Sequence, residues 1–595
     1  MELDHGVVST RDRGAPRVPR GVTSVRGAWG ALGAPHLSYR PGPRLVSVLV
    51  GGLAAVLVLY PIAYLIQASL SVGDPQARPP EAYGLDNFMG LGRYAHIFGN
   101  TLLVAAIATV FAVLFGFTMG WILSRTNVPG RAAFEQLMAM PYYVTPLMGA
   151  LAWALIASPN SGFVNQIWRA LGGDGYVVDI NTPGGIAWVM ALFEGSVAFV
   201  MIGAVMKSMD PALEEASQVM GASRLRTMLR VTLPLVLPGV LGAAVFVFAE
   251  MLGSFAAALV LGLPNRYYVV TTAIYQLVQQ YPPKIPIAAA MGTSLFVVMF
   301  VTLFIYRRII LAGSYVTITG KAFRPRVNDV GRLRWLLLAI CLFYLFCSVV
   351  LPLLTLFYAS IQKISTAFPA ASNFTTEHFY KAFTMNAATT ALGNSLWLAL
   401  WTASIGVLLM GLISWIIYRS RLPGSAVIEY IVMFPQSVPR LIFAFGMMWA
   451  WLIFPIPIYG TLWLLLIAYL TVFLPLGVRT ISGVMLQIDK SLEECAQMCG
   501  AGWGYRIRTV TVPLLWPGLI AAWLLLFVAS IRELGASILL MGPNAKVVTP
   551  TIVESWFATS AELTAAMALI QTLVIAIAMV VFLALTRRAS MYAGE

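Results

Sequence analysis

A 20-residue pattern occurs twice in this chain of 595 residues. The first copy runs from Glu215 to Pro234 and the second from Glu494 to Pro513, always 279 residues later. Each copy has a glutamate, two small residues, a glycine six positions after the glutamate, and a Val-Thr-x-Pro ending. An internal repeat at a fixed offset indicates one structural unit that is present twice. The chain is therefore expected to fold as two similar halves.

The rest of each half is apolar enough to lie in lipid. Hydrophobic residues make up 59% of the chain and charged residues 10%, and the mean hydropathy is +0.82. Apolar stretches of about 20 residues can cross a bilayer as helices. The stretches of this kind lie at 45–70, 100–123, 137–157, 184–206, 235–263, 286–311, 335–358, 394–418, 438–455, 459–481, 514–540 and 563–585. We therefore expect an all-α polytopic membrane protein with two tandem six-helix domains.

Prolines interrupt two of these stretches. Pro141 and Pro146 lie in the third, and Pro435 and Pro439 lie at the start of the ninth. Because proline removes a helical hydrogen bond and clashes with the preceding turn, we expect these two spans to be broken or partly re-entrant.

Lysine and arginine predict the orientation of the chain. The first 44 residues hold seven arginines, and only eight of the 38 basic residues fall on the opposite side of the membrane. The excess of positive charge on the cytoplasmic side places both termini and both motif copies there. The expected segments are a basic N-terminal segment, 1–44, which would lie beside anionic lipid and not be cleaved; a first domain, 45–312; a linker, 313–334; a second domain, 335–588; and a tail, 589–595.

The two copies resemble the EAA loop of bacterial ABC importer permeases, whose pattern is EAA, three residues, G, nine residues, I-x-L-P. Ser217 replaces the second alanine of the first copy, and Cys495 replaces the first alanine of the second. In that family the loop is a short helix that seats on a separate ATPase. The resemblance implies two kinds of protein partner, a dimer of ATP-binding subunits and a periplasmic solute-binding protein. It also implies ATPase-coupling residues, namely Glu214, Glu215, Ala216, Gly221, Glu493, Glu494, Ala496 and Gly500.

Each loop carries signals for a helix of about three turns. Asp210 and Asp489 are good N-cap residues, and the glutamates that follow suit the positive end of a helix. Gly221 and Gly500 are placed to end it.

The fusion of two halves in one chain resembles the ferric iron permeases. The segment 255–276 and the run 531–540 are similar to segments of that group. The resemblance implies an inner-membrane permease for ferric iron delivered by a binding protein. Importers of the same class for 2-aminoethylphosphonate, thiamine or polyamine remain open, as does a secondary transporter, since duplicated halves also occur there.

Five charged residues lie inside apolar stretches and form the candidate pathway. Such residues are costly in hydrocarbon and are expected to face the bundle interior, water or one another. They are Glu194, Glu250, Arg440, Arg532 and Glu533. Arg440 has no charged counterpart in the first half, where Pro146 stands. It either contributes to the passage of an anionic solute or a chelated metal, or it forms an ion pair with Glu533 or Glu250; for each of the five, pairing is the preferred interpretation.

Other activities have little support in the sequence. The only Gly-Lys pair, Gly320-Lys321, lacks the other glycine of a phosphate-binding loop, so we expect a transport subunit that hydrolyses no ATP, is no enzyme and has no cofactor. The net charge of +14 follows from the topology and is not accompanied by a nucleic-acid motif, so no nucleic-acid partner is expected.

No metal site is expected. Cys495 and Cys499 lie one helical turn apart, but they occupy the positions of Ala216 and Met220 in the first copy. We therefore interpret them as small packing residues, and the four histidines are too scattered to form a cluster.

Overall fold

The computed structural model describes residues 41–73, 80–210, 212–312, 329–420 and 424–592. Val50–Glu595 pack as one compact unit, and every contact discussed below lies within it. Residues 1–40 of the predicted basic segment, most of the linker and the end of the tail lie outside the described residues. The only strands in the described ranges are β1 (Ser71–Val72) and β2 (Ala82–Tyr83), which pair antiparallel with Ser71 opposite Tyr83.

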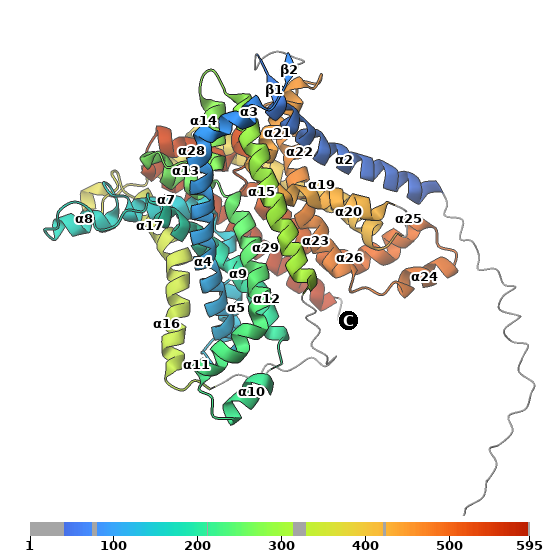
Figure 1. Cartoon of the computed structure of the whole chain (residues 1–595), viewed down its shortest axis with the longest axis horizontal. Helices are drawn as coiled ribbons and strands as arrows, with labels where there is room; N and C mark the ends of the chain where they lie inside the picture. Colours follow the sequence, from blue (N-terminus) through green and yellow to red (C-terminus); the bar gives the residue numbers. More distant parts are fainter. Residues whose placement is uncertain (1–40, 74–79, 211, 313–328, 421–423, 593–595) are drawn as a thin grey trace, which may run out of the picture. The chain divides into compact units, whose positions relative to one another are not determined.

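The architecture is all-α, as predicted (Figure 1). In the described residues, nine helical stretches are long and apolar enough to cross a membrane, and three bent pairs bring the number to as many as 12. The long helices of the first half are α2 (Pro41–Leu70), α4 (Ala95–Arg125), α9 (Pro183–Ser208), α12 (Leu233–Leu252) and α15 (Ile285–Ala312). Those of the second half are α16 (Leu333–Leu345) continued by η4 (Phe346–Val350) and α17 (Leu351–Ser360), then α19 (Asn386–Tyr418), α26 (Val512–Ile531) and α29 (Ala561–Tyr592).

The shorter helices cap or connect these spans. On the first half they are α3 (Asp86–Met89), η1 (Gly90–Tyr94), α8 (Phe163–Ala170), α10 (Ala212–Val219), α11 (Arg224–Thr227), η2 (Met228–Thr232), α13 (Ala256–Gly262), η3 (Leu263–Asn265) and α14 (Val270–Gln279). On the second half they are η5 (Ala371–Asn373), α18 (Glu377–Thr384), α24 (Ser491–Met498), α25 (Trp503–Arg506), η7 (Ile507–Thr511), α27 (Ser537–Leu540) and α28 (Val548–Ala558). Figure 1 shows α10 and α24 outside the bundle of long helices.

Three spans are broken, and the sequence predicts two of them. The third is divided into α5 (Arg131–Leu137), α6 (Met140–Tyr143) and α7 (Pro146–Ala157), with a bend of 87°. The ninth is divided into α20 (Ser425–Met433), η6 (Phe434–Ser437) and α21 (Arg440–Ile453), with a bend of 108°. The tenth also bends, by 48°, between α22 (Leu462–Val472) and α23 (Leu474–Met485), where Pro475 has no N–H to continue the helix.

The fifth and eleventh spans end earlier than expected. In the predicted stretch 235–263 the helix ends at Leu252 and the short helix α13 follows. In the stretch 514–540 the helix ends at Ile531 and the short helix α27 follows. The first segment stays apolar across its break, and the second carries only Arg532 and Glu533 there, so hydropathy averaged over either stretch does not register the break. The second break places Arg532 and Glu533 just after the end of α26 instead of within a helix.

Small residues let α4 and α9 approach closely. Ala105, Ala108 and Ala112 are fully buried along one face of α4, and Gly116 continues that face. A Cβ atom on Gly116 would lie 2.6 Å from the Cβ of Ala198 in α9. Small side chains are the usual means of close helix packing in membranes, where no hydrophobic effect drives helices together.

The first span of each half packs on the third span of the other half. The hydroxyl of Tyr60 in α2 donates to the carbonyl of Ala450 in α21, and a Cβ on Gly446 would lie 2.6 Å from the Pro61 carbonyl oxygen. In the reverse direction, α17 packs on α7 and the Tyr344 hydroxyl donates to the Leu192 carbonyl of α9. The two halves therefore share one core.

Candidate functional site

The two motif copies form equivalent short helices, α10 and α24. The carboxylate of Asp489 accepts a hydrogen bond from the Ser491 N–H at 2.9 Å, and Asp210 accepts one from the Ala212 N–H at 2.9 Å. The bond from the Ser491 backbone lowers the pKa of the Asp489 carboxyl. Each aspartate therefore binds the backbone at the start of its helix, but the residue that directly precedes α24 is Lys490, so Asp489 lies one residue before the N-cap position.

Glycines end both helices in the left-handed conformation. Gly221 has φ 87° and Gly500 has φ 84°, and the next residue of each donates back to the helix, Ala222 to Ser217 and Ala501 to Ala496. Each helix has eight residues, just over two turns and not the three that we expected. The expectation was too long because α24 begins only at Ser491 and ends at Met498, two residues before Gly500.

The paired glutamates of each helix have different surroundings. Glu214 is buried, with its Oε1 3.5 Å from Arg125 Nε, and Glu493 Oε1 lies 3.8 Å from Arg419 Nε. Glu494 is exposed in the second copy. The inner glutamate therefore faces the bundle, and the outer one is available on the surface of α24.

Neither Cys495 in α24 nor Cys499 directly after it is a packing residue. Cys495 and Cys499 are both exposed, whereas Cys341 and Cys347 are buried. The interpretation of Cys495 and Cys499 as packing residues was wrong because these positions of the helix face away from the bundle.

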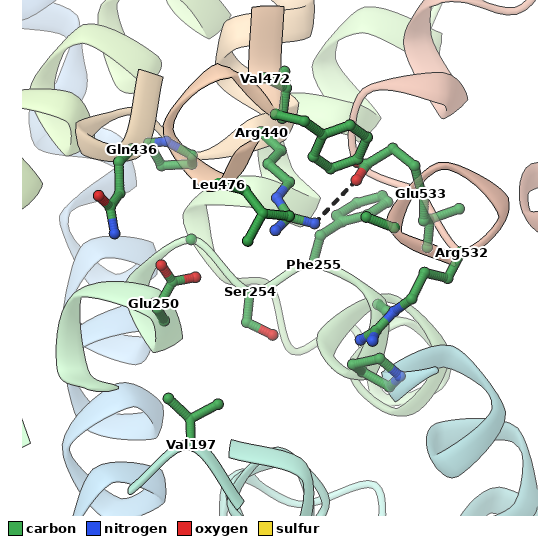
Figure 2. A pocket seen from close by; sticks show the side chains of 18 of the residues that line it. Val197, Glu250, Ser254, Phe255, Gln436, Arg440, Val472, Leu476, Arg532 and Glu533 are labelled. Atoms are coloured by element: carbon green, nitrogen blue, oxygen red, sulfur yellow. Dashed lines mark hydrogen bonds and ion pairs between the residues drawn. The ribbon is translucent and has the colours of Figure 1, made fainter. Parts of the chain in front are cut away.

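A cavity of about 490 Å³ lies between the two halves. The breaks of the third and ninth spans line it, together with α9, α12, α23 and the segment after α26 (Figure 2). All five predicted pathway residues line this cavity, so the structure brings them together. Arg479 of α23 lines it as well and was missed, because its position near the end of an apolar stretch resembled a cytoplasmic boundary.

The first half contributes carboxylates to the cavity. Glu194 comes from α9 and Glu250 from the end of α12. Neither is within ion-pair or hydrogen-bond distance of another described side chain. Figure 2 shows Glu250 directed into the same opening as Arg440.

The second half contributes arginines. Arg440 begins α21, and its Nη1 lies 3.0 Å from Glu533 Oε2, so the predicted ion pair with Glu533 is present. The Arg440 guanidinium also lies 5.7 Å from the centre of the Phe473 ring, a cation–π contact. Arg532 donates to the Tyr142 carbonyl and lies 4.9 Å from the centre of the Tyr142 ring, so it joins the second half to the broken third span of the first.

The repeat is not symmetric at the cavity. Positions 279 residues apart carry different chemistry, and the pairs are Glu194 with Phe473, Glu250 with Ala529, Gly253 with Arg532, and Ser254 with Glu533. The cavity therefore has a carboxylate wall from the first half and a guanidinium wall from the second. Such a space can hold a solute that carries both charges, or a cation together with anions.

The described residues offer no cage for a metal ion. No three histidine, cysteine, aspartate or glutamate side chains among them come close enough to bind one. The cavity charges are spread over opposite walls, which suits transient contact with a solute.

Comparisons with known proteins agree with this geometry. The family described as "Binding-protein-dependent transport system inner membrane component" matches the chain twice, over residues 112–312 and 407–591. The ferric transport system permease protein of Actinobacillus pleuropneumoniae is 24% identical over 530 residues, covering 85% of this chain and 74% of its own length. An Fe(3+)-transport system permease protein of Haemophilus influenzae is 25% identical, covering 78% of this chain and 84% of its own length. A sulfate transport system permease protein of Salmonella typhimurium is 30% identical over 34% of this chain and 72% of its own length.

Proposed function

Because the chain belongs to the family of binding-protein-dependent transport system inner membrane components and is an ABC importer permease, we propose that its cargo is ferric iron. A periplasmic binding protein would deliver the iron, and a dimer of separate ATP-binding subunits would supply the energy. The observation that carries the proposal is the cavity with carboxylates on one wall and guanidinium groups on the other. Because the chain belongs to this family, its duplicated halves are those of an ABC importer permease and not those of a secondary transporter.

The two walls suit iron that travels with anionic ligands. The free carboxylates of Glu194 and Glu250 are hard oxygen donors for a trivalent cation. A bare ferric ion would be repelled by Arg440, Arg479 and Arg532, whereas anions bound to the iron would pair with them. The relatives named for ferric transport match both halves of this chain, and the sulfate relative matches one third of it.

A second cargo has support from the same observation. 2-Aminoethylphosphonate carries an ammonium and a phosphonate group, which match the carboxylate and guanidinium walls. Thiamine and polyamines are cationic and would be repelled by the three arginines of the cavity. We therefore rank 2-aminoethylphosphonate second and the other two behind it.

The surfaces of α10 and α24 suit an ATP-binding partner. Val219 is 88% exposed and its counterpart Met498 is 85% exposed, and Leu213 and Leu492 are also exposed at matching positions. Apolar side chains that recur at equivalent exposed places mark a surface that is covered in an assembly. One ATP-binding subunit on each helix would cover them.

We further propose that both termini, α10 and α24 lie on the cytoplasmic side, and that the segments 45–312 and 335–588 are the two transport domains. Cysteines placed singly at Asp174 and Ala222, in a chain without the four native cysteines, test this orientation. An impermeant maleimide should label Asp174→Cys and leave Ala222→Cys unmodified in intact cells. The reverse pattern contradicts the orientation.

Reconstitution tests the cargo. The permease is placed in proteoliposomes with its ATP-binding subunits, and the binding protein is loaded with radioactive ferric iron or with 2-aminoethylphosphonate. We expect ATP-dependent accumulation of iron and none of the phosphonate. Accumulation of the phosphonate alone selects the second cargo, and accumulation of neither contradicts both.

A further inference from the structure

An arginine at the end of the second span of the first half joins three helices. Arg125 is the last residue of α4 and is 2% exposed. Its Nη2 donates to the carbonyls of Met206 at 2.7 Å and Met209 at 3.2 Å, at the end of α9. Its Nε lies 3.5 Å from the Glu214 carboxylate of α10. The carbonyls at a helix end have no partner in the helix, so one guanidinium satisfies them and holds the neighbouring carboxylate.

A threonine adds a fourth helix to this contact. Thr232 is 1% exposed, and its hydroxyl donates to Glu214 Oε1 at 2.6 Å. It lies at the end of the π-turn η2, where the Leu233 N–H donates to the carbonyl of Met228, five residues earlier. Because Pro234 has no N–H, the turn before α12 widens here and directs the threonine toward the glutamate.

The second half repeats the arrangement. Arg419 follows α19 and donates from Nη2 to the carbonyls of Met485 at 2.7 Å and Ile488 at 2.5 Å. Its Nε lies 3.8 Å from Glu493 Oε1, which accepts a hydrogen bond from the Thr511 hydroxyl at 3.1 Å. Thr511 also ends a π-turn, η7. The glutamate, threonine and carbonyl positions are all 279 residues from their counterparts, and the arginines are 294 apart.

The two contacts are more than packing. A buried ion pair stabilises a fold no better than apolar residues of the same shape, because both charges lose their hydration. The charges of the cavity differ between the halves. In contrast, both halves have the same arginine, glutamate and threonine at α10 and α24, which we call the coupling helices. The feature that the two halves share is the attachment of a coupling helix to the spans, and this attachment is where these residues act.

We propose that Arg125 and Arg419 are positioning residues that transmit movement of the coupling helices to the spans. In each half the arginine, the inner glutamate and the threonine connect the coupling helix to three spans. These spans are α4, α9 and α12 in the first half, and α19, α23 and α26 in the second. A displacement of α10 or α24 by an ATP-binding subunit therefore moves three spans together. The proposal rests on the proposed coupling of these helices to ATP-binding subunits.

Variants of the second half test the role in the reconstituted complex. Arg419→Gln removes the positive charge and the planar guanidinium group. Thr511→Val removes the hydroxyl, and Thr511→Ser keeps it. The measured quantity is solute accumulated per ATP hydrolysed, together with deuterium exchange of residues 489–500. We expect Arg419→Gln to lower the ratio about tenfold, within the usual range of coupling between sites, and to speed exchange in α24. Thr511→Val should act in the same direction and Thr511→Ser should match the unmodified protein.

The matched control is Arg308→Gln, the same substitution at an exposed arginine at the end of another span. It should leave the ratio unchanged. If Arg419→Gln does not fold, Glu493→Gln decides, because it keeps the shape and the bond from Thr511 while removing the charge. An unchanged ratio in Glu493→Gln and Thr511→Val contradicts the proposal. Loss of ATP-driven uptake in the unmodified protein instead contradicts the proposed function.

Discussion

Arg440 and Glu533 form an ion pair in which the two partners have opposite environments. The atoms Nη1 and Oε2 are 3.0 Å apart, and the side chain of Arg440 is 57% exposed whereas that of Glu533 is 1% exposed. Glu533 also accepts a hydrogen bond from the Ala536 N–H at 3.0 Å, so it is fixed by the backbone. The carboxylate therefore holds the arginine, and the open side of the guanidinium remains available to a solute.

Removing Arg440 should affect transport more than abundance. We expect Arg440→Ala to lower uptake per folded transporter about tenfold, equivalent to about 1.4 kcal/mol of barrier. Arg440→Lys should recover part of the rate because it keeps the positive charge but loses the planar guanidinium group with its paired N–H donors. The double variant Arg440→Ala with Glu533→Gln separates contact with the solute from structural pairing, because it also removes the Glu533 charge that the single variant leaves unpaired. Full recovery of uptake in the double variant contradicts a role in the pathway.

Removing a free carboxylate should leave stability intact. Glu250→Gln keeps the shape of a side chain that has no ion pair among the described residues, so abundance and melting temperature should not fall. Uptake of iron should fall at least about fivefold, because a favourable charge contact of about 1 kcal/mol is lost. Glu554→Gln is the control, since Glu554 pairs with Lys546 outside the cavity. Unchanged uptake in both Glu250→Gln and Glu194→Gln contradicts a cationic cargo.

The glycine that ends α24 should tolerate asparagine and reject valine. Gly500 has φ 84° and open space where a Cβ atom would lie, so the only obstacle to a side chain is the backbone conformation. The left-handed region costs an ordinary residue about 1–2 kcal/mol and costs asparagine less. We expect Gly500→Val to weaken binding of the ATP-binding subunit in a pull-down titration and Gly500→Asn to keep most of it. Equal binding by the two variants contradicts this explanation.

Close packing of α4 and α9 should make Gly116 intolerant of any side chain. The Cβ of Gly116→Ala would lie 2.7 Å from the Ala198 carbonyl carbon, and backbone cannot move aside as a side chain can. Overpacking of this kind costs about 1–3 kcal/mol. A lower melting temperature in detergent is expected for Gly116→Ala. Gly99→Ala on the same helix, where no atom lies within 4 Å, should melt like the unmodified protein.

Structural features that follow from the internal repeat or from hydropathy could be predicted from the sequence. Features that depend on tertiary contacts could not. The spans, the breaks next to Pro146 and Pro439, and the backbone bonds of Asp210 and Asp489 depend on local chemistry and were predictable. The bend at Pro475 was missed because the apolar stretch around it is continuous.

Distant contacts explain the other misses. Arg125 and Arg419 stand at ends of spans that we predict to be cytoplasmic, where arginine is expected from topology alone, and only the fold shows that they reach α10 and α24. The same holds for Arg479, whose place in the cavity depends on the bend before it. The asymmetry of the cavity was visible in part, since Arg440 has no charged counterpart in the first half.

The packing of α2 on α21 has a consequence for biogenesis. Tyr60 and its partner Ala450 are separated by 390 residues, so the first span enters the membrane long before its neighbour has been synthesised. At about 5–20 residues per second, a bacterial ribosome needs about 20–80 s to make the intervening chain. During that time α2 has only lipid, or the insertion machinery, against the face that later meets α21. The contact between the first and ninth spans therefore forms late in synthesis. Truncated chains that stop before the ninth span leave the first span without this partner.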